Sequence, residues 1–161
     1  MSSLLNRISE LEKQLTALKT KIEKENKRWR SKEDWDIYWL VCSNGEPNWS
    51  YELNRDSDNF RYDTHNYFQT EEEAQKYASV LETERQLKKF ADEHNDVIDW
   101  SNINQHKWCL YYNYKYYRVD IGNPCWSKDA RTIFFSSKEI AEQAINEIGE
   151  EKITEYLTYE W

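Results

Sequence analysis

The feature that most constrains the fold is a pattern that occurs twice, at Asn66–Ala78 (NYFQTEEEAQKYA) and at Thr132–Ile145 (TIFFSSKEIAEQAI). Each copy has an aromatic, strand-like approach, a hydroxyl residue, and then apolar residues at helical spacing. The second copy follows at a constant offset of 67 residues, which aligns Phe68, Thr70, Glu72 and Ala74 with Phe135, Ser137, Glu139 and Ala141. A duplicated strand-to-helix module is therefore expected.

Strand signals precede both copies, so we predict an α+β fold. The predicted organisation is a coiled-coil helix with a basic end over residues 1–34, then two tandem antiparallel-sheet-plus-helix modules over residues 35–95 and 96–161. Each module has only about 60 residues, which is small for an independent core. We therefore expect the two modules to pack against each other.

Local signals predict the element ends. In the first module, Trp49–Leu53 and Phe60–Tyr62 indicate strands, with a loop over Asn54–Asn59 and a turn at Asn44-Gly45. Thr70 and Glu73 have the spacing of a capping box, and the helix they begin is expected to end near His94.

The second module has equivalent signals. Two strands, Lys107–Tyr112 and Tyr116–Ile121, are expected to form a hairpin. A capping box is predicted at Ser136 with Glu139, and a helix break at Gly149.

The N-terminal segment carries a heptad pattern typical of a short coiled coil. Three heptads are marginal for an isolated helix, so this one needs a partner. A second copy of the chain, another protein, or the rest of this chain could provide it, and a homodimer is our leading prediction. The predicted dimerisation residues are Leu4, Ile8, Leu11, Leu15, Leu18 and Ile22.

Charge divides the chain into two parts. The net charge is −8, and residues 1–34 carry nine basic and six acidic residues, which leaves −11 for the remainder. An acidic body repels phosphate backbones, which argues against direct nucleic-acid binding. The basic residues at 24–32 around Trp29 fit a helix C-terminus, and phosphate contact is the alternative.

Known catalytic patterns are missing from the sequence. Only three glycines occur and they stand far apart, so no phosphate-binding glycine loop is formed. Neither the three cysteines nor the three histidines have metal-ligand spacing. We therefore predict no enzyme activity, no cofactor and no metal. No apolar run is long enough to span a bilayer and no signal peptide is apparent, so a soluble, cytoplasmic protein is expected.

Aromatic residues make up 16% of the chain, including 8 Trp and 12 Tyr. They either fill the core or form a recognition surface. A hairpin that is aromatic on both faces cannot bury every ring in so small a protein, and exposed aromatics among acids suit protein binding. The candidate protein-binding residues are Trp49, Tyr51, Glu71, Glu72, Tyr111, Tyr114, Tyr116, Glu147 and Glu150.

The heptad helix, the motif NYFQTEEEAQKYA, the short IDWSN segment and TIFFSSKEIAEQAINEIGEEKI occur here in that order. The combination resembles small proteins of phages and mobile elements of Gram-positive bacteria. Accessory proteins of that kind include inhibitors of host defence, among them anti-CRISPR proteins. Where this family has a glycine before Asn-Tyr-Phe, the chain has His65.

The leading hypothesis is a dimeric, non-enzymatic inhibitor that blocks a host protein, such as a nuclease, through an acidic aromatic surface. The alternative is a protein that sequesters a small ligand or nucleotide in an aromatic pocket, either between the modules or across the dimer. A nucleic-acid binder that uses residues 24–32 is a third hypothesis.

Overall fold

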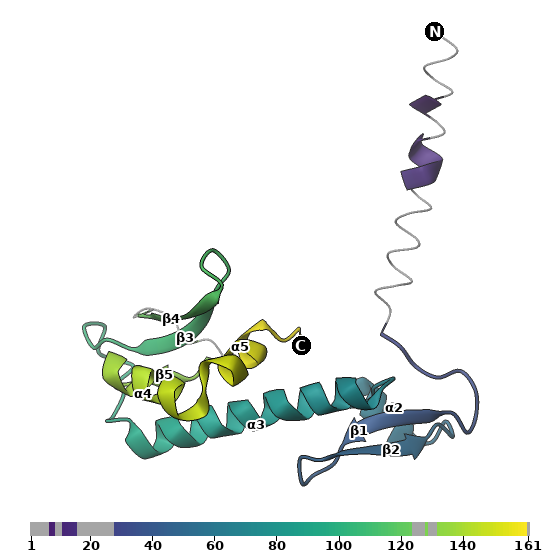
Figure 1. Cartoon of the computed structure of the whole chain (residues 1–161), viewed down its shortest axis with the longest axis horizontal. Coiled ribbons are helices and arrows are strands. Elements are labelled where there is room, and N and C mark those ends of the chain that lie inside the picture. Colours follow the sequence, from purple (N-terminus) through teal and green to yellow (C-terminus); the bar gives the residue numbers. More distant parts are fainter. Residues whose placement is uncertain (1–6, 9–10, 16–27, 124–127, 129–131, 161) are drawn as a thin grey trace.

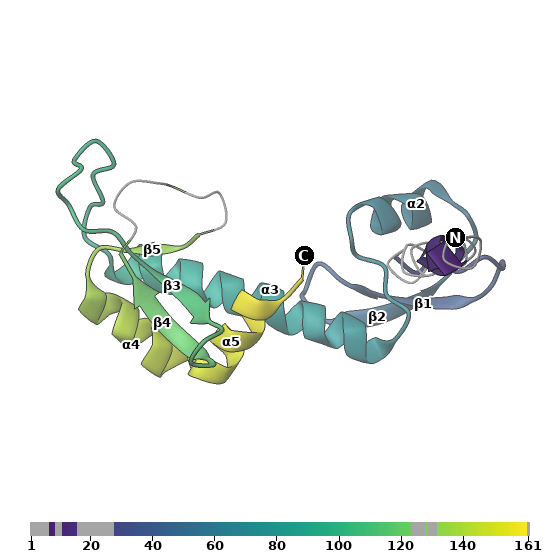
Figure 2. The ribbon, with the colours of Figure 1, turned by 90° about the horizontal axis from the view of Figure 1, so that it is seen from above.

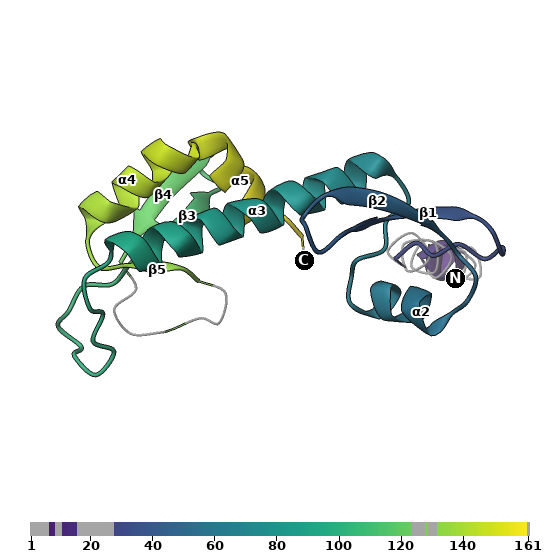
Figure 3. The ribbon, with the colours of Figure 1, turned by 90° about the horizontal axis from the view of Figure 1, so that it is seen from below.

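The computed structural model describes residues 7–8, 11–15, 28–123, 128 and 132–160. Its described part is mixed α and β, with two small antiparallel sheets, as the sequence predicts. A long helix, α3 (Glu71–His94), runs from the first sheet to the second (Figure 1). The views from above and below show one sheet toward each end of this helix (Figure 2, Figure 3).

The first sheet is a hairpin of β1 (Ile37–Val41) and β2 (Pro47–Tyr51). The predicted turn is present, and Gly45 takes a φ of 88°, a value that suits glycine. On its other side, β1 meets the chain at Phe68, where Trp39 and Phe68 exchange two backbone hydrogen bonds of 2.8 Å. The Asn-Tyr-Phe approach therefore lies beside β1.

The prediction of a strand at Phe60–Tyr62 is wrong, because these residues belong to helix α2 (Asp56–Asp63). A buried carboxylate causes the helix to begin here. The Asp58 Oδ2 atom accepts the backbone N–H groups of Leu53 at 3.2 Å and of Arg55 at 3.0 Å. Arg55 is the N-cap of α2 and Asp58 its third residue, so the bond to the Arg55 N–H is one half of a capping box, while the bond to Leu53 holds the preceding chain.

The second sheet has the strand order β4-β3-β5, from β3 (Trp108–Asn113), β4 (Arg118–Gly122) and β5 (Phe134–Phe135). The predicted hairpin is therefore confirmed. Helix α4 (Lys138–Ile148) follows β5, and Gly149, at φ 100°, separates it from α5 (Glu150–Thr158).

The predicted cap of α4 is one residue too early. The side chain of Ser137, not that of Ser136, accepts the N–H of Ile140 at 3.2 Å. Ser136 instead joins the end of α3 to β5, because its N–H donates to Asn95 Oδ1 at 2.9 Å and its hydroxyl oxygen accepts from the N–H of Asp96.

Helix α3 begins and ends as predicted. Thr70 and Glu73 form the capping box, and the helix ends at His94. Its first half packs Ala74 and Ala78 against Val41 of β1. Its second half contributes to the largest apolar core, whose members include Val80, Leu87, Phe90, Phe135, Ala141, Ala144 and Ile153. One helix therefore supplies packing surface to both sheets.

His65 has a φ of 62°, which lies in the left-handed region. A non-glycine residue is uncommon there, and glycine adopts this conformation at little cost. Glycine would therefore be less strained than histidine at this position.

Within the described residues, no helix is long and apolar enough to cross a membrane. Residues 7–8 and 11–15 are helical, while Leu4, Leu18 and Ile22 lie outside the described residues. The side chains of Ile8, Leu11 and Leu15 are exposed. The coiled coil and the division of the chain into three domains stay predictions.

Candidate binding surfaces and an aromatic pocket

Two stacked tyrosines lie at the centre of a buried polar network under the first sheet. The rings of Tyr38 and Tyr67 are 3.9 Å apart with an interplanar angle of 12°. The Tyr38 hydroxyl donates to Asp58 at 2.8 Å, and the Tyr67 hydroxyl donates to Glu52 at 2.8 Å. Both carboxylates are almost completely buried.

Each buried acid also has a cationic partner. Arg61 donates to the Tyr38 hydroxyl and lies 3.7 Å from the Asp58 carboxylate. Arg30 lies 3.3 Å from the Glu52 carboxylate. Buried charges that are paired and hydrogen-bonded in this way are what a stable interior requires. The network therefore fastens α2 and the segment before β1 to the sheet.

Two pKa shifts follow from this arrangement. Burial alone would raise the pKa of Asp58, but the hydrogen bonds from the Arg55 backbone and the Tyr38 hydroxyl outweigh it and lower the pKa. Burial, together with the Glu52 carboxylate, raises the pKa of Tyr67. Asp58 is therefore charged and Tyr67 is neutral at pH 7.

An exposed aromatic cluster lies on the other face of the first sheet. It consists of Trp35, Ile37, Trp49 and Tyr51, and we name it the β1–β2 cluster. Tyr51 is 5.8 Å from Trp35 and 5.2 Å from Trp49, measured between ring centroids, and it lies opposite Ile37 in the strand register. The structure thus brings the predicted residues Trp49 and Tyr51 together.

Trp35 is the most exposed member of the cluster, with 67% of its surface accessible, and its φ is 73°. Such a φ is a genuine outlier for a bulky residue. Backbone hydrogen bonds of 2.8 Å fix it, from the Trp35 N–H to the Glu52 carbonyl and from the Glu52 N–H to the Asp36 carbonyl. The prediction of site residues missed Trp35 and Ile37, although the alternation in DWDIYW places both on the face of Trp39.

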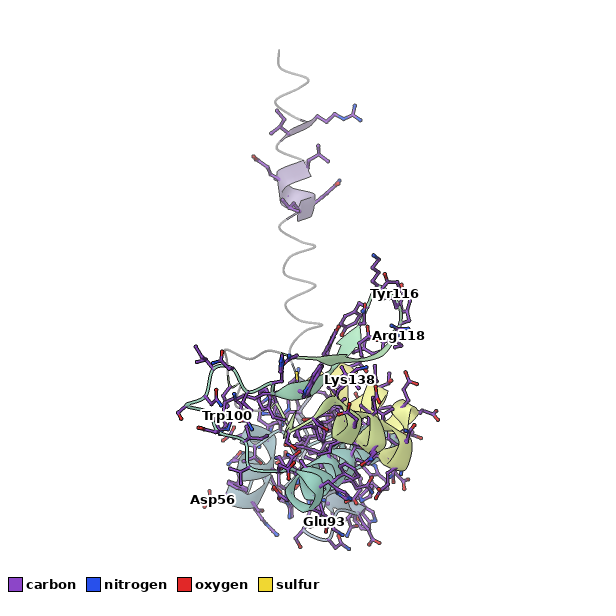
Figure 4. The ribbon with its side chains drawn as sticks, turned by 90° about the vertical axis from the view of Figure 1, so that its left-hand side faces the viewer. Asp56, Glu93, Trp100, Tyr116, Arg118 and Lys138 are labelled. Atoms are coloured by element: carbon purple, nitrogen blue, oxygen red, sulfur yellow. The ribbon has the colours of Figure 1, made fainter. Side chains whose placement is uncertain are left out.

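The other predicted aromatics lie on the β3–β4 hairpin. Tyr111, Tyr114 and Tyr116 are exposed there, as is Tyr117. Tyr116 and Arg118 stand at the projecting end of the hairpin (Figure 4), with the Arg118 guanidinium 5.5 Å from the Tyr116 ring centroid. The hairpin and the first sheet lie at different ends of the molecule (Figure 1), so the predicted aromatics form two separate surfaces.

The four predicted acids are also dispersed. Glu71 and Glu72 are exposed in the first turn of α3, where the helix dipole favours negative charge. Glu147 is exposed near the end of α4. Glu150, at the start of α5, accepts the backbone N–H of Val119 at 3.2 Å and so ties α5 to β4.

A pocket of about 630 Å³ lies where the segment before β1, the start of α3 and the C-terminal residues meet. Its aromatic lining comes from Trp29, Tyr67, Phe68, Tyr77 and Tyr159. Trp29 lies 5.6 Å from Tyr67, Phe68 lies 5.1 Å from Tyr77, and Tyr77 lies 5.9 Å from Tyr159, all between ring centroids.

Histidine and acidic side chains do not gather into a metal site. Across the described ranges, no group of three or more His, Cys, Asp or Glu residues could hold a metal ion. His94 stacks on Phe90 at 4.0 Å, and His106 contacts the Asn123 side chain. Cys109 is buried and Cys42 is half-buried, while Cys125 lies outside the described residues.

Comparison with models of known protein families, with curated protein sequences and with solved structures finds no match.

The buried network predicts a specific acid sensitivity. Because the folded-state pKa of Asp58 lies below its ordinary value of 3.8, its stabilising contribution is complete above about pH 5 and is lost as pH falls through the folded-state value. Urea unfolding should therefore show a large stability difference between wild type and Asp58→Asn at pH 7 and a smaller one at pH 3. Asp56→Asn, at an exposed position of the same helix, is the control. An equal difference at both pH values would contradict this role for Asp58.

Proposed function

We propose that this chain is a non-enzymatic protein-binding module and that the β1–β2 cluster is its binding surface. The observation that carries the proposal is Trp35, because its backbone is held in a disfavoured conformation while its ring stays in solvent. A strained backbone conformation persists only where the surrounding structure enforces it, and such conformations are frequent at ligand-binding positions. Packing of the core gives no reason for it.

The composition of the cluster suits a protein partner. Tryptophan and tyrosine are the residues that most often dominate the binding energy of protein interfaces. Here two Trp, one Tyr and one Ile are contiguous and exposed, and Glu33, Asp34 and Asp36 are exposed in the adjoining chain. The matching partner surface is an apolar pocket with basic residues at its rim.

The biological role we propose is inhibition of a host defence protein in the manner of an anti-CRISPR protein. The resemblance to phage and mobile-element proteins supports it, and so does the charge of −11 on residues 35–161. If the target is a nuclease, this charge would compete with nucleic acid for a basic groove. Binding would then weaken strongly with added salt.

We also propose that residues 35–95 and 96–161 are tandem copies of one module. Their strand pairings support this. In the first, β1 lies between β2 and the residue Phe68, and in the second, β3 lies between β4 and β5, which contains Phe135. In both, the third segment leads directly into a helix capped by Thr70 or Ser137.

Pull-down followed by direct titration tests the binding surface. Immobilised wild-type protein and a Trp35→Ser, Trp49→Ser variant are exposed to bacterial lysate, and any protein retained by wild type is purified. Its affinity for the double variant should fall by about 100-fold or more, since removal of one dominant aromatic residue costs about 2 kcal/mol or more.

The matched control is Tyr114→Ser, Tyr116→Ser, which removes two exposed aromatics without a left-handed backbone from the β3–β4 hairpin. It should bind the retained protein as wild type does, and near-UV circular dichroism should show that both variants are folded. The proposal is wrong if the Trp35, Trp49 variant keeps full affinity or if wild type retains no protein.

We propose further that the chain forms a homodimer through Leu4–Ile22. The heptad pattern supports this, as does the exposure of Ile8, Leu11 and Leu15 in the described helical residues, where the rest of the chain leaves them uncovered.

Light scattering measures this directly. Wild type should have twice the mass of one chain, and Leu11→Glu, Leu18→Glu should have the mass of one chain, because buried charges at seam positions are costly. Lys13→Glu, at a position that points away from the seam, should remain dimeric. A monomeric wild type would rule the dimer out.

A further inference from the structure

One nitrogen of a cationic side chain in the aromatic pocket lacks a hydrogen-bond partner. Arg28 lines the pocket, and its Nη2 atom is buried with no hydrogen-bond acceptor among the described residues. Almost all buried polar groups in proteins have a partner, and a charged donor without one is costly. The guanidinium instead lies 4.2 Å from the Tyr62 ring centroid, which supplies only a cation–π contact.

A second cation, Lys76 on α3, lines the same pocket. Its Nζ atom is 6.0 Å from the Tyr159 ring centroid. Two acids, Glu73 and Glu160, also line the pocket, so its formal charges balance, but within the described residues neither acid forms an ion pair with either cation. The Glu73 carboxylate already accepts the N–H groups of Gln69 at 2.9 Å and Thr70 at 3.3 Å, and Glu160 is exposed.

The walls of the pocket suit a flat ring. Trp29, Tyr77 and Tyr159 reach it from the segment before β1, from α3 and from the residues after α5. Aromatic rings stack on such walls at little entropic cost. A volume of about 630 Å³ is in the usual range for small-molecule sites.

We propose that this pocket binds a small molecule that combines a flat aromatic ring with a negatively charged group. The ring lies among Trp29, Tyr77 and Tyr159, and the anionic group accepts hydrogen bonds from Arg28 and Lys76. A cationic ligand fits less well, because Arg28 and Lys76 already place positive charge at the Tyr62 and Tyr159 rings. The site shares no residue with the β1–β2 cluster, so it stands apart from the proposed protein-binding function.

Isothermal titration calorimetry with two matched pairs of probes tests this inference. AMP is compared with adenosine, and indole-3-acetate with indole-3-acetamide, so that each pair differs in charge while the ring is the same. At least one anionic probe should bind wild type about tenfold or more tightly than its neutral analogue, since hydrogen bonds to charged groups are the stronger ones. AMP alone would identify a phosphate site, and indole-3-acetate a carboxylate site.

Variants assign the effect to the two parts of the pocket. Arg28→Gln should abolish the preference for the anionic probe, and Lys76→Gln should reduce it. Trp29→Ala should weaken the anionic and neutral probes alike. Lys89→Gln, at an exposed position near the other end of α3, should change nothing. Thermal melting checks that each variant is folded.

Two results would overturn the inference. One is the absence of binding by both anionic probes to the wild-type protein. The other is an unchanged preference for the anionic probe in Arg28→Gln, which would place the binding site elsewhere on the molecule.

Discussion

The packing of α3 against both sheets is the interaction on which the rest of the structure depends. A unit of about 60 residues buries too little apolar surface to be comfortably stable alone. Helix α3 has 24 residues, so it is long enough for its first turns to pack on one sheet and its later turns on the other. Ala74 and Ala78 meet the first sheet, and Leu87 and Phe90 enter the core of the second. Helix α3 also contacts the residues that follow α5, because the ring of Tyr77 lies beside that of Tyr159.

The interiors around the two sheets are held together by different interactions. Around the second sheet the interior is a continuous apolar core that includes Phe135 and Ile153. Around the first sheet the interior is smaller, and charged and aromatic side chains fill it, with Tyr38 and Tyr67 between Asp58 and Glu52. Such a network demands a fixed geometry, because every buried charge must keep its partner.

This rigidity bears on both proposed sites. Glu52 joins them, because its carboxylate accepts from Tyr67, a lining residue of the pocket, while its backbone pairs with Trp35 and Asp36 beside the β1–β2 cluster. Glu52 therefore holds the strained backbone of Trp35 through its main chain and the Tyr67 hydroxyl through its side chain. In this proposal the first sheet supports both candidate sites, while the largest apolar core lies around the second sheet.

Much of the fold could be predicted from local sequence signals. Thr70 with Glu73, Gly149 and the strand alternation on either side of Asn113 each specify a local conformation, and the structure has all three. The exception, α2, depends on Asp58, whose tyrosine and arginine partners the sequence pattern does not reveal.

The sites were less predictable than the fold. Trp49 and Tyr51 could be found because strand alternation places them on one face. The same alternation extends to Trp35, but its left-handed backbone conformation could not be predicted, because it depends on hydrogen bonds with the distant Glu52. The pocket is formed by three segments that are far apart in sequence, so only the general expectation of an aromatic pocket could be stated.

Native-state hydrogen exchange along α3 tests the central claim, that this helix joins both sheets into one cooperative body. The amides of Ala78 and Phe90 lie in the halves of α3 that serve different sheets. If the claim is correct, both should exchange with one free energy of opening, equal to that of global unfolding in urea. A distinctly lower value at Ala78 would contradict it, because the first sheet would then unfold by itself while the second stayed intact.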